Sequence, residues 1–263
     1  MKNIFTQLGK KTVDVIEELG YVFMLFYEAV GWLLLGKFRH QSVRLRHVFH
    51  ETVQIGVQAV PIAIILCFSV GMMLAIQGLE TLERYGAQSQ VVTGIALSVT
   101  REFSALIIGI LVAGRSGSSI TARIGTMTES QEIDALQVIG IQPVRYLAAP
   151  LLVAMIIVMP SLTIIGDLMG MLGGAIYTSY ELNMTVATYM ERSFAVIDVY
   201  DVMQGLMKSI VFAIIIVLVS ISNGFQVSGG AEGVGKATTR SVVLSVSFIV
   251  IADMIFTFFL TRI

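Results

Sequence analysis

The sequence predicts an all-α integral membrane protein, with an N-terminal amphipathic helix at the membrane surface, five transmembrane helices and one further cytoplasmic helix. Of its 263 residues, 56% are hydrophobic and only 13% are charged, about half the charged share of a soluble domain. The mean hydropathy is +0.84. Apolar stretches of about 20 residues, the length that crosses a bilayer, recur along the chain. Together these observations exclude a soluble globular protein.

Composition also excludes several classes of function. The net charge of −1 is far from the strong positive balance of a nucleic-acid binder. A single cysteine, Cys67, allows neither an internal disulfide nor a cysteine zinc cluster. The three histidines, His40, His47 and His50, lie in one basic stretch without cysteine or convincing carboxylate partners. We therefore expect no metal site, and because no nucleophile–base pair is evident, we expect the chain not to be an enzyme.

The first 50 residues differ from the rest. Between Met1 and Gly36, lysines and acidic residues alternate with apolar ones, and the apolar run after Tyr21 is short and contains Glu28. This pattern favours an amphipathic helix lying in the interface over a membrane span. We assign residues 1–50 to this N-terminal region and residues 51–263 to a transmembrane domain.

Five apolar stretches supply the spans of this domain. The first is long and contains Pro61, and the third is long enough to tilt or break. The predicted spans are Val53–Leu79, Val91–Gly114, Leu147–Tyr177, Gly205–Ser222 and Val242–Leu260.

Loop charges orient the spans. The segment Lys37–Glu51 is rich in basic residues and is expected in the cytoplasm. The loop after the first span and the segment 181–201, which includes Asp201, are mostly acidic and are expected outside. Lys236 and Arg240 return the loop before the last span to the cytoplasm. The prediction is a cytoplasmic N-terminus and an external C-terminus.

Charged residues lie within the predicted spans. Each charge near the centre of a membrane helix costs about 2.5–3.5 kcal/mol on insertion scales, so these helices must face protein or a wet cavity. At 1.5 Å per residue, all four of Glu102, Asp167, Lys208 and Asp253 fall in the outer half or near the middle. One interpretation is that they pair as structural contacts between helices, which we favour for Asp167. The other, favoured for the rest together with Arg101, is a polar pocket for a head group or charged substrate.

A small-residue stripe marks the third span. Gly166, Gly170 and Gly174 recur every four residues, which places them on one helix face for close backbone approach. The stripe favours packing within one subunit over a seam between two copies.

The segment Gly230–Lys236 fits G-x-x-x-x-G-K, the start of a phosphate-binding loop. Ala237 stands where the motif needs Ser or Thr, and a membrane span takes the place of the preceding strand. We interpret the segment as a flexible loop before a helix that begins near Ala237.

The longest loop, residues 115–146, has balanced charges and apolar residues at helical spacing. Gly140 followed by Pro143 is a helix stop signal. We predict an amphipathic cytoplasmic helix, suited to docking a soluble partner, and the spacing from Asp134 to Gly140 is loosely similar to the loop by which importer permeases contact their ATPases.

Five motifs stand out in the sequence: Gly71–Gly78 (GMMLAIQG), Arg101–Phe103 (REF), Val112–Met127 (VAGRSGSSITARIGTM), Glu132–Tyr146 (EIDALQVIGIQPVRY) and Gly233–Arg240 (GVGKATTR). Together they resemble the MlaE family, permease subunits of ABC transporters that work with MCE-domain proteins in lipid traffic. The resemblance covers roughly residues 40–260, and its central motif is long and specific. After Arg101-Glu102, Phe103-Ser-Ala replaces the family's usual residues. This replacement allows a local helix geometry that differs from that of the family.

The resemblance implies an inner-membrane homodimer with cytoplasmic ABC ATPase subunits, a periplasmic MCE-domain protein and possible association with a small cytoplasmic STAS-type subunit. ATP and magnesium would bind the ATPase, with no cofactor in this chain and no nucleic-acid partner. The lipid would be a phospholipid, although a sterol or another apolar molecule also suits a greasy cavity. By motif match and depth, the expected lipid-binding residues are Leu74, Gln77, Leu82, Tyr85, Arg101, Glu102, Lys208 and Asp253. The expected ATPase-coupling residues are Glu129, Glu132, Asp134, Ala135, Leu136, Gly140, Pro143 and Arg145.

Two other functions remain open at this point. One is an ion- or proton-coupled secondary transporter that uses Glu102 or Asp253 as a relay, although no pair of matching halves is evident. The other is a structural membrane anchor for an MCE complex. Within the lipid-permease hypothesis, either Arg101 or Glu102 faces the cavity, and Arg101 is expected to pair with Asp253 or Asp167.

Overall fold

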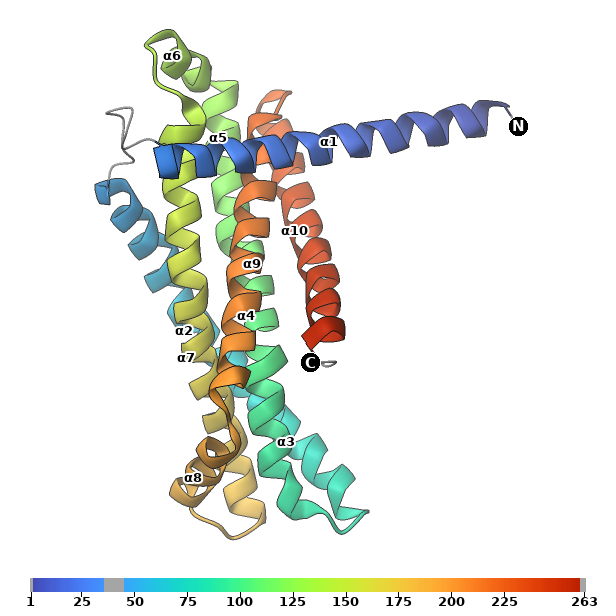
Figure 1. Cartoon of the computed structure of the whole chain (residues 1–263), viewed down its shortest axis with the longest axis vertical. Coiled ribbons are helices and arrows are strands. Elements are labelled where there is room, and N and C mark those ends of the chain that lie inside the picture. Colours follow the sequence, from blue (N-terminus) through green and yellow to red (C-terminus); the bar gives the residue numbers. More distant parts are fainter. Residues whose placement is uncertain (1, 36–44, 261–263) are drawn as a thin grey trace.

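The computed structural model describes residues 2–35 and 45–260, and these residues form an all-helical bundle (Figure 1). Five of its helical stretches are long and apolar enough to cross a membrane, which confirms the predicted fold class. The α-helices are α1 (Lys2–Leu35), α2 (Leu45–Glu83), α3 (Val91–Ser98), α4 (Ser104–Val112), α5 (Ser118–Glu129), α6 (Glu132–Val138), α7 (Ala149–Glu181), α8 (Val186–Val196), α9 (Val199–Phe225) and α10 (Gly230–Leu260).

The second spanning stretch is one helical column built from several segments. It runs as Gln88–Glu129 and contains two π-helical turns, η2 (Val99–Phe103) and η3 (Ala113–Gly117). Single π-helical turns widen a helix locally and often occur at functional sites. A short 3₁₀ turn, η1 (Gln88–Gln90), precedes this column, and a third π-helical turn, η4 (Val144–Ala148), leads into α7.

Three predicted boundaries are wrong because the helices continue past the apolar residues. The predicted loop 115–146 is helical up to Glu129, so only its second half connects two spans. The last helix begins at Gly230 rather than near Ala237, and the segment 230–236 is therefore its first turns instead of a flexible loop. The fourth helix begins at Val199 rather than Gly205, so Asp201 belongs to the bundle. Where a helix projects beyond the bilayer, its residues become more polar but its backbone stays helical.

Helices α2 and α7 form the tightest contact of the bundle. A Cβ on Gly71 would lie 1.9 Å from the carbonyl oxygen of Gly170, and one on Gly173 would lie 2.0 Å from that of Phe68. Backbones this close require glycine at both positions. Gly170 of the predicted stripe is therefore used for packing within the subunit.

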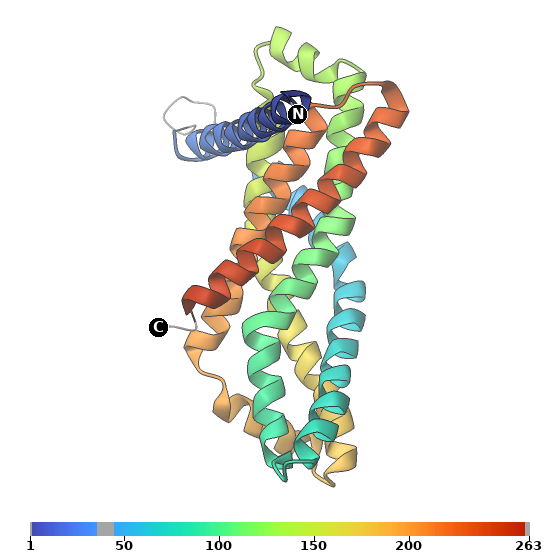
Figure 2. The ribbon, with the colours of Figure 1, turned by 90° about the vertical axis from the view of Figure 1, so that its right-hand side faces the viewer.

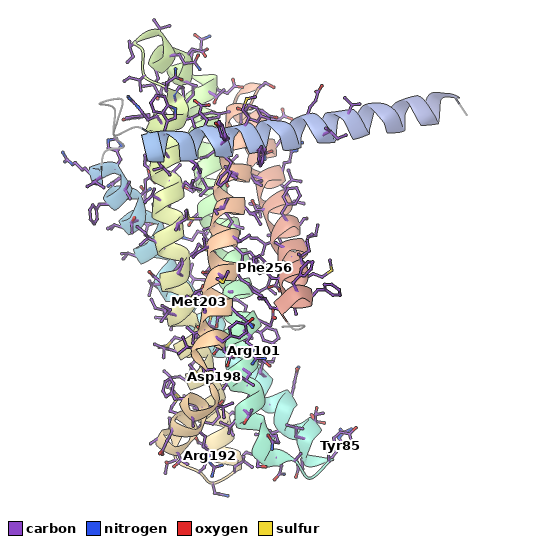
Figure 3. All side chains as sticks on the ribbon, in the orientation of Figure 1. Tyr85, Arg101, Arg192, Asp198, Met203 and Phe256 are labelled. Atoms are coloured by element: carbon purple, nitrogen blue, oxygen red, sulfur yellow. The ribbon has the colours of Figure 1, made fainter. Side chains whose placement is uncertain are left out.

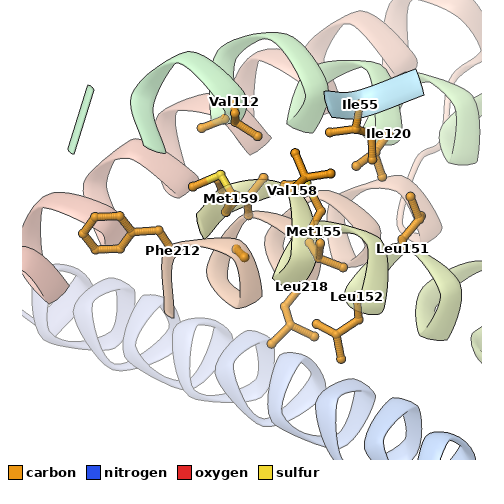
Figure 4. Packing of buried hydrophobic residues seen from close by; sticks show 14 of the residues in the cluster. Ile55, Val112, Ile120, Leu151, Leu152, Met155, Val158, Met159, Phe212 and Leu218 are labelled. Carbon is orange, nitrogen blue, oxygen red and sulfur yellow. The ribbon is translucent and has the colours of Figure 1, made fainter. Parts of the chain in front are cut away.

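The main core lies between α2, α4, α7 and α9 (Figure 4). Met155, Met159 and Leu152 of α7 are almost fully buried there, beside Ile216 of α9. These apolar side chains fill the space between helices whose outer faces remain apolar, as expected for a protein surrounded by lipid.

Helix α1 runs across the bundle instead of along it (Figures 1 and 2). Leu25 and Ala29 are buried against the bundle, whereas Phe23, Met24 and Tyr27 on the other side are exposed. This arrangement fits the predicted interfacial helix, with one side on protein and the other free to meet lipid. The basic residues 37–44 that orient the predicted topology lie outside the described residues.

Helix α10 crosses the bundle obliquely and ends before the other helices do (Figure 2). Helices α3 and α8 extend further at the same end of the molecule (Figure 1). Tyr189 fixes α8 in this region, because its side chain is completely buried beside Gly174 of α7. Burial raises the pKa of the Tyr189 phenol to about 12, so the hydroxyl stays neutral at physiological pH.

Candidate functional site

Five charged side chains from three helical elements meet near the end of α10, and we call them the outer cluster. The π-helical turn η2 supplies Arg101 and Glu102, α9 supplies Asp201 and Lys208, and α10 supplies Asp253. The predicted grouping of Glu102, Lys208 and Asp253 is therefore confirmed by their contacts. These contacts do not themselves test a role in lipid binding.

Lys208 lies at the centre of this cluster. Its side chain is only 1% exposed and forms an ion pair with Glu102 and a second with Asp253, at 3.0 Å. The Lys208 ammonium also donates a hydrogen bond to the hydroxyl of Thr257 at 3.0 Å, and that hydroxyl lies 2.9 Å from the Glu102 Oε1. The buried ammonium is thus satisfied from two neighbouring helices, which offsets the penalty of removing it from water.

Arg101 makes a separate ion pair. Its Nε donates to the Asp201 Oδ1 at 2.6 Å, and the Arg101 side chain is 45% exposed while that of Asp201 is 2% exposed. The other Asp201 oxygen accepts the backbone N–H of Asp198 at 2.9 Å, which caps the start of α9. Figure 3 shows Arg101 beside the start of α9, near Asp198. Asp201 therefore joins the helix cap to the charged cluster.

The predicted partners of Arg101, Asp253 and Asp167, are wrong. Asp253 pairs with Lys208, and Asp167 is buried in α7 at a level where Gly166 approaches Cys67 and Ser104. Arg101 and Glu102 reach different partners, as neighbouring residues on a helix do. Both of them nevertheless line the same cavity, so the expectation that only one of the two faces it is wrong.

Sequence reasoning missed Asp201 because the apolar run begins four residues later, at Gly205. A signal was present in the pattern Asp198-x-x-Asp201 before an apolar stretch, which is similar to a helix-capping box. That pattern starts the helix at Val199 and places the Asp201 carboxylate in its first turn.

A cavity of about 450 Å³ opens beside the outer cluster. Arg101 and Glu102 line it with Gln204, Tyr200 and apolar residues. The cavity combines ionised groups with apolar walls, so it can hold a molecule that has both a polar and an apolar part.

The four residues predicted from α2 and its following loop lie apart from this cavity. Leu74 and Leu82 pack in a smaller apolar cluster between α2 and α3. Gln77 is exposed on α2, and Tyr85 is 80% exposed at the tip of the loop (Figure 3). Within one copy of the chain, these residues do not share a cavity with Arg101 and Glu102, and their lipid-binding role stays a prediction.

The predicted coupling segment lies at the opposite end of the molecule, around α6 (Figure 1). Helix α6 ends at Val138, and Gly140 has a φ of +81°, which agrees with the predicted stop. Leu136 is half-buried, Pro143 is buried, and Arg145 lies 5.6 Å from the ring centre of Trp32 in α1. The exposed members of the predicted set are Glu129, Glu132, Asp134, Ala135 and Gly140.

Two exposed apolar residues at the end of α6 are not among the predicted coupling residues. Val138 and Ile139 are 86% and 68% exposed, although Ile133 of the same helix is buried against the bundle. An apolar tip beyond the predicted membrane boundary is typical of a surface that another protein covers.

Comparisons with known proteins agree with this architecture. Residues 48–259 match the family described as permease MlaE. A probable ABC transporter permease protein of Rickettsia typhi is 34% identical over 255 residues, which cover 97% of this chain and 96% of that protein. The intermembrane phospholipid transport system permease protein MlaE of Haemophilus influenzae is 30% identical over 259 residues, with 97% and 96% covered.

A chloroplast protein is also similar. The chloroplastic protein Trigalactosyldiacylglycerol 1 of Arabidopsis thaliana is 32% identical over 218 residues, which cover 83% of this chain and 62% of that protein. The family match extends from the start of α2 almost to the end of α10, and so includes all five spanning stretches. The chain is therefore a multi-pass ABC transporter permease that belongs to the MlaE family.

Proposed function

We propose that this chain is the lipid-translocating permease of an ATP-driven transporter in the inner membrane, with a phospholipid as substrate. The observation that carries the proposal is the outer cluster, of whose five charged side chains Arg101 and Glu102 line a cavity of about 450 Å³ with partly apolar walls. A phospholipid has the same combination of charge and apolar surface. The name of the Haemophilus relative, which includes intermembrane phospholipid transport, supports the same substrate class.

The proposed complex contains two copies of the chain, cytoplasmic ABC ATPase subunits that bind ATP and magnesium, and a periplasmic MCE-domain protein. The α6 end faces the cytoplasm and the α8 end faces the periplasm, with a cytoplasmic N-terminus and a periplasmic C-terminus. Helix α1 lies across the bundle near the α6 end, so the predicted cytoplasmic N-terminal region and the predicted coupling segment share one side of the membrane (Figure 1).

Reconstitution tests the proposal directly. The chain, its ATPase and its MCE partner are placed in proteoliposomes, and transfer of a fluorescent phospholipid to acceptor MCE protein is followed with and without ATP. We expect transfer that requires hydrolysable ATP. Transfer driven by a proton gradient without the ATPase would indicate a secondary transporter, and a complex that assembles but transfers nothing would indicate an anchor.

The exposed tip of α6 is the proposed ATPase contact. Val138→Glu would place a charge where an apolar surface is covered by the partner, and an unpaired buried charge costs several kcal/mol. We expect ATPase subunits to be lost on purification, or ATP hydrolysis to continue without lipid transfer. The matched control is Val199→Glu, which changes a similarly exposed valine (82% exposed) at the other end of the molecule. Equal behaviour of the two variants would contradict the assignment of α6.

A further inference from the structure

A second polar cavity lies between α2 and the η3–α5 segment, on the opposite side of the bilayer from the outer cluster. Its volume is about 200 Å³, several times the ~30 Å³ that one water molecule occupies. We call it the inner arginine pocket, and the polar residues that line it are Glu51, Gln54, Gln58, Arg115, Ser116, Ser119 and Arg123.

The pocket carries an excess of positive charge. Arg123 forms an ion pair with Glu51 at 2.8 Å, whereas Arg115 donates at 2.6 Å to the neutral side-chain oxygen of Gln58. Among the described residues, no carboxylate forms an ion pair with Arg115. With both arginines and Glu51 ionised, the pocket has a net charge of +1.

Several hydrogen-bond donors in this pocket are unused. The Arg115 Nη1 and the Arg123 Nε are buried and have no hydrogen-bond partner among the described residues. The hydroxyls of Ser116 and Ser119 likewise make no hydrogen bond within the described part of the chain. Buried donors are rarely left without a partner, and guanidinium and hydroxyl groups together are the groups that bind phosphate.

The pocket lies at the depth of lipid head groups. The hydroxyl of Thr121 in α5 donates a hydrogen bond to the hydroxyl of Ser241 in α10 at 2.9 Å, so these two residues lie at the same depth in the bundle. The predicted last span starts at Val242, directly after Ser241, and the predicted second span ends at Gly114, directly before Arg115. Arg115 therefore lies at the end of the predicted second span, and Arg123 lies about 12 Å further along the same helix, toward α6.

The same face of α2 becomes apolar as it continues toward the middle of the bilayer. Ile62, Ile65 and Leu66 follow Gln58 at the three- and four-residue spacing of one helix face, and all three are exposed. On the floor of the pocket, Ile55 and Ile120 lie close together (Figure 4). A basic pocket at the interface that leads onto an exposed apolar track matches a phosphate group with an attached acyl chain.

We propose that the inner arginine pocket binds the phosphate group of a phospholipid in the cytoplasmic leaflet, with an acyl chain along Ile62, Ile65 and Leu66. The pocket is large enough for a head-group phosphate and too small for a whole lipid. This proposal adds a second lipid site to the proposed function and uses the same orientation, but binding here requires neither ATP nor a partner protein.

The test measures binding to the purified full-length chain in detergent by native mass spectrometry. The probes are dioctanoyl phosphatidylglycerol, dioctanoylglycerol without a phosphate group, and inorganic phosphate. We expect the phospholipid to bind and both other probes to bind at least about tenfold more weakly, because each lacks one half of the proposed contacts.

Two variants are expected to change phospholipid binding in opposite directions. Arg115→Gln removes the unpaired charge and should weaken phospholipid binding by about tenfold or more, the effect of losing a charge-assisted hydrogen bond. Glu51→Gln raises the pocket charge from +1 to +2 and should strengthen binding, which keeps the test decisive if the first variant misfolds. Arg84→Gln, which changes an exposed arginine paired with Glu80 at the other end of α2, is the matched control and should leave binding unchanged.

Three results would overturn the proposal. Equal binding of inorganic phosphate and phospholipid would indicate a free-anion site, and unchanged phospholipid binding in both Arg115→Gln and Glu51→Gln would place the lipid elsewhere. Dissociation of dimers by Arg115→Gln without a change in lipid binding would make the pocket an interface between two copies. If ATP-driven transfer fails but Arg115→Gln still weakens lipid binding, the pocket stands and the proposed transport function is wrong.

Discussion

The outer cluster and the inner arginine pocket lie on the same helical column, and each includes residues of a π-helical turn, η2 or η3. They differ in how their charges are matched. In the outer cluster, Lys208 is buried between two carboxylates and the five charges sum to −1. In the inner pocket, Arg115 is half-buried beside a neutral glutamine and the charges sum to +1.

This difference separates what each site contributes. A buried charge that is paired inside the protein makes folding depend on its partner, because removal of one member leaves the other unpaired in low dielectric. A partly exposed charge without a counter-ion contributes little to stability and remains available to a ligand. We therefore expect the loss of a single charge to destabilise the protein more in the outer cluster than in the inner pocket, where Arg115 is free to bind an anionic head group.

The largest expected effect on stability comes from Lys208→Met. Without the ammonium, Glu102 and Asp253 would be adjacent carboxylates with no cation between them, and breaking a buried pair in this way costs about 3–5 kcal/mol. Thermal unfolding in detergent should show a large loss of stability, or the yield of monodisperse protein should fall. Lys236→Met, which removes an exposed lysine paired with Glu232, should stay within about 0.5 kcal/mol of the wild type; a similar loss in both variants would contradict the comparison.

The next effect is steric and leaves all charges in place. A Cβ on Gly205 would lie 2.5 Å from the carbonyl oxygen of Thr100, at the contact between α9 and η2. Gly205→Ala should separate these elements and cost about 1–3 kcal/mol, as overpacking does. The control is Gly94→Ala in α3, where a Cβ meets nothing within 4 Å and alanine should be neutral or stabilising. Equal melting temperatures for both variants would show that the close approach is not needed.

Asp201→Asn should have a smaller effect. The amide oxygen can still accept the Asp198 N–H, but the ion pair with Arg101 is lost. Because Arg101 is 45% exposed, water can replace its partner, and the expected loss is about 1 kcal/mol in thermal unfolding. A loss as large as that of Lys208→Met would mean that Arg101 depends on its pair as strongly as the buried lysine does.

The smallest effect on stability is expected for Arg115→Gln. The arginine is partly exposed and, among the residues that the structure describes, its side chain bonds only to a neutral one, so the change should stay within about 1 kcal/mol. Its lipid binding should nevertheless fall the most among these single variants. Unfolding and lipid retention measured on the same preparations reveal whether the two rankings run in opposite directions, as the comparison requires.

Much of the fold could be predicted from the sequence, because apolar length is a direct signal for a membrane helix. The five spans and the grouping of Glu102, Lys208 and Asp253 follow from composition and depth. Composition does not reveal where a helix continues outside the bilayer, which is why the start of α9 and the partner Asp201 were missed.

The inner arginine pocket was missed for a different reason. Arg115 and Arg123 belong to a predicted loop, where arginines are expected to be solvated. Only the tertiary structure places them on a continuous helix opposite Glu51 and Gln58 of α2. Pairing between segments more than 50 residues apart has no local sequence signal, whereas the glycine stripe of α7 does, because close packing requires small residues at fixed spacing.

The central claim is that the charges of the outer cluster act on lipid and do not merely hold helices together. The most direct test is the triple variant Glu102→Gln, Lys208→Met and Asp253→Asn, which removes the buried charges together and leaves none unpaired; such replacement is often tolerated or even stabilising. The measurement is ATP-driven phospholipid transfer per assembled complex in proteoliposomes. We predict normal dimers and normal ATPase binding with at least about a tenfold loss of transfer, which corresponds to roughly 1.4 kcal/mol. Transfer at the wild-type rate would contradict the account and leave the cluster as a structural contact.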